Sequence, residues 1–181
     1  MTKPIQQVSE MDKKFFKMLR QDVADFMKES GQKYDKDELR VLDIAPQDHA
    51  GAKPQFPMSN VETLDIDSSS GATYIADICL NNQDLMQDDT FDVVVCTEVL
   101  EHTLNPFEAV KEIYRILKPG GVALISVPYN FRIHGPLPDC WRFTEHGLRA
   151  LLGNFEIKEL TALEDEDRFL MPIHYTVVAQ K

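Results

Sequence analysis

The stretch that decides the fold is residues 91–121, which read FDVVVCTEVLEHTLNPFEAVKEIYRILKPGG. It opens with an apolar run whose centre, residues 93–95, consists of three valines. Such a β-branched run predicts a strand that is buried on both faces. An acidic turn follows at residues 97–102, and a second apolar run at residues 122–127 predicts another buried strand.

Between the two predicted strands, the sequence carries strong signals for a helix. Asn105 can cap it, Pro106 suits the first helical position, and the Pro-Gly-Gly run at residues 119–121 is expected to stop it. Helical spacing predicts one buried face, made of Phe107, Val110, Ile113, Ile116 and Leu117. Strand, helix and strand in this order form a right-handed crossover in a parallel sheet. The acidic turn therefore falls at the carboxyl end of a strand, where open α/β sheets bind their ligands.

The same stretch resembles a known family. FDVVVCTEVLEH followed by NPFEAVKEIYRILKPGG is similar to the central segment of class I S-adenosylmethionine-dependent methyltransferases, in particular the small type 11 group. The resemblance covers about residues 40–181 and is strongest from Phe91 onward. It implies a Rossmann-like three-layer α/β sandwich, with a mostly parallel seven-stranded sheet and a C-terminal antiparallel strand pair. It also implies S-adenosylmethionine as the cofactor.

The chain has 181 residues, which favours a single domain. We expect an N-terminal helix and linker at residues 1–39 and a Rossmann-like core at residues 40–181. Ser9 can cap the first helix and Gly31 is expected to end it. The apolar positions of this helix repeat at helical spacing; they are Met11, Phe15, Met18, Leu19, Val23, Phe26 and Met27.

Composition excludes several classes of function. The net charge of −11 disfavours nucleic acid as a partner, because backbone binding needs clustered basic residues. The sequence shows neither a run of transmembrane length nor a secretory leader, so we expect no membrane partner and a cytoplasmic location. The three cysteines are scattered and no HxxxH or HxH pattern occurs, so no metal site is expected.

The loop after the first predicted strand departs from the family. The resemblance places Asp-x-Gly-x-Gly-x-Gly here; Asp43 matches, but Ala45, Gln47 and His49 stand at the glycine positions. A pyrophosphate needs such glycines for close approach, which argues against a nicotinamide or flavin cofactor. S-adenosylmethionine has no phosphate, so the loss weighs less against it. We expect Asp43, Ala45, Pro46 and Gln47 to contact this cofactor, and Pro54 and Pro57 to interrupt the helix that normally follows.

Other acidic strand ends suggest further cofactor contacts. Asp65 ends a predicted strand at residues 61–65, about 20 residues after Asp43, the spacing of acids that hold ribose hydroxyls. The alternative is an Asx-turn. By resemblance, Ile66 lies beside that site, and Asp77 with Ile78 ends a strand at residues 73–77 and contacts adenine; plain solvation is the rival for Asp77. Thr97, Glu98 and Val99 are expected at the methionine end, with Glu98 the most specific prediction.

The long aromatic insertion at residues 128–143 is the predicted acceptor loop, because substrate contacts concentrate in loops at this sheet edge. Its candidate substrate-binding residues are Tyr129, Arg132, Trp141 and Arg142. For the arginines, surface salt bridges are the alternative. For Trp141, core packing is the alternative to stacking on a sugar or aromatic acceptor. A helix capped by Thr144 and a strand pair at residues 155–164 and 172–179 complete the chain.

Methyl transfer from a sulfonium is an in-line displacement that mainly requires alignment and exclusion of water. A hydroxyl acceptor would also need a general base. His134 is the first candidate, and the alternative is a loop histidine that bonds backbone carbonyls. His102 and Glu101 are the other candidates; the alternative for both is bracing of the acidic turn, which we favour for Glu101. Asp139 is expected to orient His134 or to grip the substrate, with capping of a turn as the alternative. The sequence thus predicts a methyltransferase acting on a small molecule, such as a sugar or a glycan or natural-product precursor. The alternative is a non-catalytic binding protein on the same fold; oligomeric state is not indicated.

Overall fold

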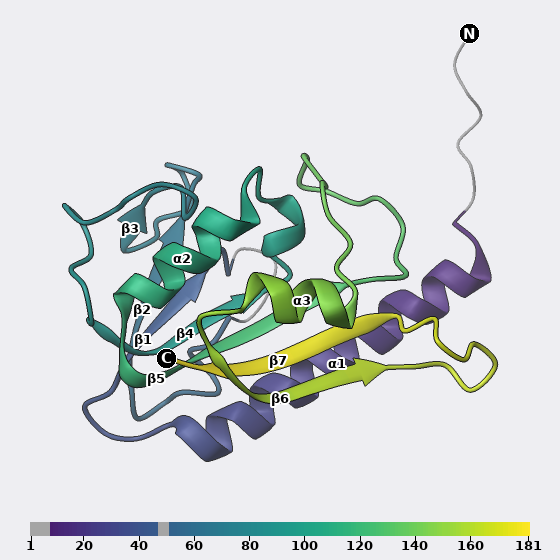
Figure 1. The fold of residues 1–181 in the computed structure, drawn as a ribbon, viewed down its shortest axis with the longest axis horizontal. Coiled ribbons are helices and arrows are strands. Elements are labelled where there is room, and N and C mark those ends of the chain that lie inside the picture. The colour runs from purple at the N-terminus through teal and green to yellow at the C-terminus, as the bar shows by residue number, and fades with distance from the viewer. Residues whose placement is uncertain (1–7, 47–50) are drawn as a thin grey trace, which may run out of the picture.

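The computed structural model describes residues 8–46 and 51–181 (Figure 1). Its elements, in chain order, are α1 (Glu10–Tyr34), β1 (Arg40–Ile44), β2 (Asn60–Asp65), β3 (Tyr74–Ile75), β4 (Phe91–Thr97), the 3₁₀ turn η1 (Leu100–His102), α2 (Pro106–Ile116), β5 (Leu117–Pro128), α3 (Glu145–Leu151), β6 (Glu156–Leu163) and β7 (His174–Gln180). The strands form one seven-stranded sheet in the order β3-β2-β1-β4-β5-β7-β6. Only the pairs that involve β7 are antiparallel, so the predicted sheet is confirmed.

The central crossover is present, but its helix ends earlier than predicted. α2 stops at Ile116, and Leu117 already pairs with Phe91 in the sheet. The Pro-Gly-Gly run therefore lies inside an irregular start of β5, where the register with β4 shifts. A Cβ atom on Gly121 would lie 3.0 Å from the carbonyl oxygen of Asp92, so glycine is needed for this close strand approach.

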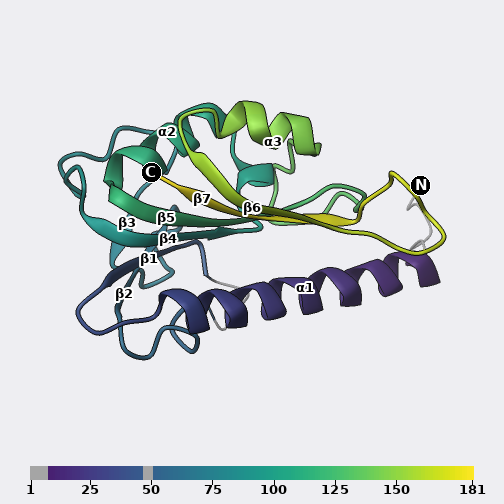
Figure 2. The same cartoon turned by 60° about the horizontal axis from the view of Figure 1, so that its bottom comes forward.

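One face of the sheet is covered by α1 (Figure 2). Its buried stripe of Leu19, Val23 and Met27 packs on the valine-rich face of β1, β4 and β5. Met11 has the helical spacing of this stripe, but it is 55% exposed in the first turn of the helix. Helical spacing gives a direction around the axis, but it does not say how far the sheet extends beneath the helix.

Gly31 does not end α1, contrary to the prediction. The helix continues to Tyr34, and Gly31 is buried within it. A Cβ atom there would stand 2.2 Å from the carbonyl oxygen of Gln55. Gly31 therefore lets α1 contact the backbone of the turn at residues 51–59. That turn contains no helix, as Pro54 and Pro57 predicted.

The opposite face is covered by α2 and α3 (Figure 2). Ala109, Val110, Ile113 and Ile116 of α2 enter the larger core cluster, together with Leu148 of α3. Phe107 was predicted to be buried but is 62% exposed. At about 100° per residue, Phe107 points roughly 120° from the middle of the buried stripe, so it lies outside the contact.

The edge strand β3 is shorter than predicted, two residues instead of five. The hydroxyl of Thr73 accepts a hydrogen bond from the backbone N–H of Thr63 at 3.1 Å and so replaces the next bond of the ladder. At its other end β3 stops at Ile75, so Asp77 lies two residues beyond the strand rather than at its end. Among the described residues, no helix is both long enough and apolar enough to cross a bilayer.

Candidate active site

The carboxyl ends of β1 and β4 open into a cavity of about 210 Å³ beside α1. The cavity is lined by Arg20, Val23, Ala24 and Met27 of α1, and by Asp43, Ala45, Pro46, Gly51, Gln55, Val95 and Thr97. Three predicted cofactor residues on β1 and its loop therefore share one cavity with Thr97. Gln47, Asp48 and His49 lie outside the described residues. The N-terminal helix α1 thus forms one wall of this cavity.

Asp43 is buried and supports the altered loop. Its Oδ2 accepts a hydrogen bond from the backbone N–H of Ala52 at 2.6 Å. Burial raises the pKa of Asp43 to about 6, and the Ala52 hydrogen bond opposes that shift. Ala45 has a φ angle of 53°, the left-handed conformation that glycine adopts without strain. Ala45 therefore has a backbone conformation that favours glycine, although the residue is alanine.

Asp65 combines both readings of its sequence position. One carboxylate oxygen, Oδ1, accepts the backbone N–H of Asp67 at 2.8 Å, which is the Asx-turn. The other, Oδ2, is buried and has no hydrogen-bond partner. Buried carboxylate oxygens are normally satisfied, so Oδ2 is available to a ligand donor. The next residue, Ile66, is 70% exposed and adds an apolar side chain just after the end of β2.

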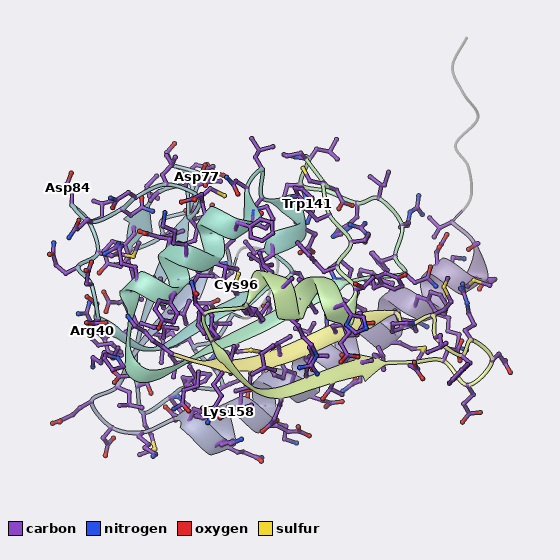
Figure 3. The ribbon with its side chains drawn as sticks, in the orientation of Figure 1. Arg40, Asp77, Asp84, Cys96, Trp141 and Lys158 are labelled. Atoms are coloured by element: carbon purple, nitrogen blue, oxygen red, sulfur yellow. The ribbon has the colours of Figure 1, made fainter. Side chains whose placement is uncertain are left out.

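The predicted adenine residues lie differently. Asp77 is half-buried, and its Oδ1 accepts the backbone N–H of Cys79 at 2.8 Å, so it closes a local turn. Ile78 is only 5% exposed and packs into the core. In Figure 3, Asp77 and Trp141 both lie along the upper side of the molecule, and Lys158 on the opposite side. The adenine assignment of Asp77 and Ile78 stays a prediction.

Glu98 of the acidic turn belongs to an ionic triad, centred on a buried histidine, that sequence reasoning missed. His174, the first residue of β7, is fully buried; its Nε2 lies 2.8 Å from Glu98 Oε1 and its Nδ1 lies 2.6 Å from Asp22 Oδ2. Glu98 Oε1 also accepts the hydroxyl of Ser126 at 2.9 Å. Ionised carboxylates only accept hydrogen bonds, so both ring nitrogens donate and the imidazole is charged. We call Asp22, His174 and Glu98 the paired triad.

The electrostatics of the paired triad follow from this geometry. Burial alone would lower the pKa of His174, but hydrogen bonds to Asp22 and Glu98 raise it to about 9. Burial alone would raise the pKa of Glu98, yet the His174 hydrogen bond and charge hold that pKa below its usual range. Glu98 also has a φ angle of 56°, a strained conformation for a non-glycine residue. The triad thus fixes an unusual backbone turn at the mouth of β4, between Thr97 and Val99.

Three residues later, a second cluster is not paired in this way. Glu101 is fully buried and neither carboxylate oxygen has a hydrogen-bond partner. Its Oε1 lies 3.7 Å from His102 Nε2 and 3.8 Å from His134 Nε2. Burial, reinforced by the charge of Glu98, raises the pKa of Glu101 well above its usual range. The structure therefore brings the three predicted base candidates together; we call them the Glu101 cluster.

The predicted acceptor loop is held by its own residues. Asp139 accepts two hydrogen bonds from the Arg142 guanidinium and one, at 3.0 Å, from the backbone N–H of His134. The Arg142 guanidinium holds the pKa of Asp139 well below its usual range. Arg142 also donates to the carbonyls of Phe131 and Arg132. Arg142 thus joins the two ends of the loop. The salt bridge that was the alternative to substrate binding is therefore present for this arginine.

The remaining loop candidates differ in exposure. Trp141 is 39% exposed, stacks on Phe143 and donates its indole N–H to the carbonyl of Thr103 at 2.8 Å. Tyr129 is half-buried with its ring 6.1 Å from Tyr175, and Arg132 is exposed. Trp141 and Arg132 are therefore exposed, whereas Tyr129 mainly packs; the substrate-binding roles of all three stay predictions.

A larger hollow, about 370 Å³, lies elsewhere, among Asp88, Asp89, Arg115 and Lys181. Asp88 and Asp89 precede β4, so this hollow is at the amino ends of the strands. Its charged groups already pair with one another: Arg115 contacts Asp88 and Lys181 contacts Asp89. The smaller cavity at the carboxyl ends is the better candidate, because ligands of open α/β sheets bind at that edge.

Comparison with known proteins agrees with this geometry. The family described as "Methyltransferase domain" matches residues 13–171. The chain belongs to this family, and its fold is that of the class I S-adenosylmethionine-dependent methyltransferases, as the resemblance predicted. S-adenosylmethionine is the cofactor that this class implies.

Among curated relatives, a ubiquinone biosynthesis O-methyltransferase of Rickettsia prowazekii is 35% identical over 68 residues, 38% of this chain and 27% of the relative. One of Pseudomonas putida is 45% identical over 38 residues, 21% of this chain and 16% of the relative. The matched segment thus spans about a quarter or less of these relatives.

Solved structures share the fold at low identity. A SAM-dependent methyltransferase of Methanosarcina mazei has a TM-score of 0.63 at 19% identity and covers 83% of this chain and 95% of its own. The [4+2]-cyclase SpnF has a TM-score of 0.66 at 14% identity and covers 87% and 80%. Because a cyclase shares the fold, the fold alone does not specify the reaction.

Proposed function

We propose that this protein transfers the methyl group of S-adenosylmethionine to an oxygen atom of a small-molecule acceptor. The unpartnered, buried Oδ2 of Asp65 is the observation that carries this proposal. It is an acceptor at the strand end where nucleoside-binding α/β folds hold ribose hydroxyls. The cavity beside Asp43 and Thr97 would receive the methionine end, next to the turn that contains Glu98.

In this reaction the acceptor oxygen attacks the methyl carbon in line with the departing sulfur. A carbon–oxygen bond forms, the carbon–sulfur bond breaks, and the sulfonium becomes a neutral thioether. The acceptor proton leaves to a base, for which His134 and His102 stay the predicted candidates. Ala45 and Thr97 line the cavity, and residues 128–143 would cover the acceptor and exclude water.

The choice of oxygen as the accepting atom is supported by the relatives, whose names describe O-methyltransferases. A sugar or a glycan or natural-product precursor is the proposed acceptor class, because Trp141 offers an exposed ring face in the acceptor loop. The rival hypothesis, a non-catalytic binding protein, rested on the missing glycines. Ala45 weakens it, since this residue retains the glycine-like backbone conformation.

Calorimetric titration with S-adenosylhomocysteine tests the cofactor site. The variant Asp65→Asn keeps the Oδ1 acceptor of the Asx-turn but replaces the free oxygen with an amide. We expect it to bind about 10–100-fold more weakly than wild type, because a hydrogen bond to a charged group is lost. Asp37→Asn is the matched control; Asp37 is exposed and precedes β1, at the other end of the strand. Equal affinity in wild type and Asp65→Asn would contradict the assignment.

Turnover is tested separately, by release of S-adenosylhomocysteine from S-adenosylmethionine in the presence of sugar and phenolic acceptors. Acceptor-dependent release that disappears in Asp65→Asn supports the enzyme. Tight cofactor binding without release on either acceptor class would favour the non-catalytic alternative.

A further inference from the structure

The Glu101 cluster contains a buried carboxylate without a hydrogen-bonded cation. The carboxylate of Glu98 has His174 as its cation, and the carboxylate of Asp139 has Arg142. Glu101 is fully buried without a hydrogen bond to either oxygen, and its nearest imidazole nitrogens lie beyond hydrogen-bond distance. An uncompensated buried carboxylate costs several kcal/mol, so this site calls for a cation or a proton.

The orientation of His102 points to a cation rather than to a hydrogen bond. Its Nδ1 lies 2.9 Å from the carbonyl oxygen of Pro138. A carbonyl only accepts, so Nδ1 carries the proton and, in the neutral ring, Nε2 presents a lone pair. This nitrogen lies 3.7 Å from Glu101 Oε1, which is also an acceptor. Two acceptors separated by this gap are what a metal ion between them would reconcile.

His134 supplies the third donor from the acceptor loop. Its Nε2 lies 3.8 Å from Glu101 Oε1, and the ring centroids of His102 and His134 are 4.8 Å apart. Its Nδ1 lies 3.1 Å from Asp139 Oδ2, off the direction of a hydrogen bond. Metal-binding histidines usually have such a carbonyl or carboxylate beside the nitrogen that does not bind.

The separations suit an ion after a small adjustment. One ligand atom from each of the three residues lies within 4.8 Å of the others. Tetrahedral ligands about 2.0–2.2 Å from zinc stand roughly 3.3–3.5 Å apart, so the side chains would need to move by about 1 Å or less. The backbone is already joined: the N–H groups of Cys140 and Trp141 donate to the carbonyl of Glu101 at 2.7 and 3.2 Å.

We propose that Glu101 Oε1, His102 Nε2 and His134 Nε2 bind a divalent first-row metal ion. Two imidazoles and one carboxylate are a ligand set for such ions, and three protein ligands leave coordination positions open. The sequence did not reveal this site, because it shows only the adjacent pair at residues 101–102 and a histidine 32 residues further on.

The proposal goes beyond the proposed methyl transfer and does not depend on it. If that function holds, an acceptor oxygen on the ion would lose its proton more easily, because bound cations lower the pKa of coordinated oxygen. His102 and His134 would then act as ligands instead of as free bases.

The test is metal binding by the chelator-stripped 181-residue chain, without cofactor, in a Cys140→Ser background that removes the exposed thiol near the site. We expect Zn²⁺ to bind with one-to-one stoichiometry by calorimetry, and Co²⁺ to give visible bands typical of nitrogen and oxygen ligands. Glu101→Gln and His134→Ala should each weaken Zn²⁺ binding by about 100-fold or more, since loss of a ligand exceeds the 10–100-fold effect of outer residues.

His146→Ala is the matched control, because His146 is an exposed histidine on α3 outside the cluster. It should bind Zn²⁺ as tightly as the parent. Circular dichroism and thermal melting of each variant separate loss of the site from loss of the fold. The proposal is overturned if the parent binds no Zn²⁺ at 100-fold molar excess, if folded Glu101→Gln binds it equally well, or if His146→Ala weakens it as much as His134→Ala.

Discussion

Two carboxylates three residues apart, Glu98 and Glu101, lie in opposite electrostatic situations. In the paired triad, Glu98 accepts from His174 and Ser126, and the charged imidazole also reaches Asp22. In the Glu101 cluster, both carboxylate oxygens lack a hydrogen bond although the residue is fully buried. The first arrangement holds α1, β4 and β7 together; the second leaves binding capacity unused. A satisfied buried charge indicates a structural role, and an unsatisfied one indicates a ligand.

The largest expected effect comes from breaking the paired triad at its centre. His174→Ala leaves two acidic side chains facing each other with no cation, and it opens a cavity in the core. We expect the free energy of unfolding to fall by about 2–4 kcal/mol, somewhat below the range for fully buried pairs because Asp22 is partly exposed. Urea unfolding at pH 7 measures it. A loss below about 1 kcal/mol would show that the triad does not hold the fold.

A matched pair of substitutions, Glu98→Gln and Glu101→Gln, compares the two carboxylates directly, and its expected effect on stability is intermediate in size. Glu98→Gln removes a charge that His174 needs and should destabilise the metal-free protein by about 1–3 kcal/mol. Glu101→Gln removes an uncompensated charge and should be neutral or stabilise it by up to about 1 kcal/mol. Thermal melting in the presence of a chelator compares them. Equal destabilisation by both variants would contradict the difference drawn between the two clusters.

The smallest effect is on the pH dependence of stability. The pKa of His174 is about 9 in the folded protein, against an ordinary value near 6.5. A raised histidine pKa stabilises the fold fully below the unfolded value, and this stabilisation is lost as pH rises through the folded value. Wild type should therefore lose about 1–2 kcal/mol between pH 7 and pH 9. Urea midpoints across that range measure the loss, and His174→Ala should show none of it; an identical slope in both proteins would refute the assignment.

The main elements were predictable because they depend on local order. The valine run of β4 and the cap and apolar stripe of α2 predicted the central crossover of the sheet. The errors arose at contacts between distant segments. Gly31 was read as a helix stop, whereas it allows close packing against Gln55, and Phe107 was read as core although the helix turns it outward.

In the candidate site, too, local features were predicted and contacts between distant segments were not. Asp43, Asp65, Glu98, His102 and His134 were all proposed from strand ends and the acceptor loop, because chain order places those segments at one sheet edge. Their pairing was not identified. His174 lies 76 residues from Glu98 and 152 from Asp22, and no local pattern links them.

The sequence by itself predicted an open α/β sheet with a central crossover, since hydrophobic periodicity and turn residues act over a few positions. The motif resemblance at residues 91–121 added the class I methyltransferase family. Only the tertiary structure decided which carboxylate is neutralised. The register of β7 against β5 and the packing of α1 bring His174 to Glu98, and the folded acceptor loop brings His134 to within 3.8 Å of Glu101 without satisfying it. Such charges are compensated through space rather than along the chain, because electrostatic and hydrogen-bond partners need only be near in the folded state.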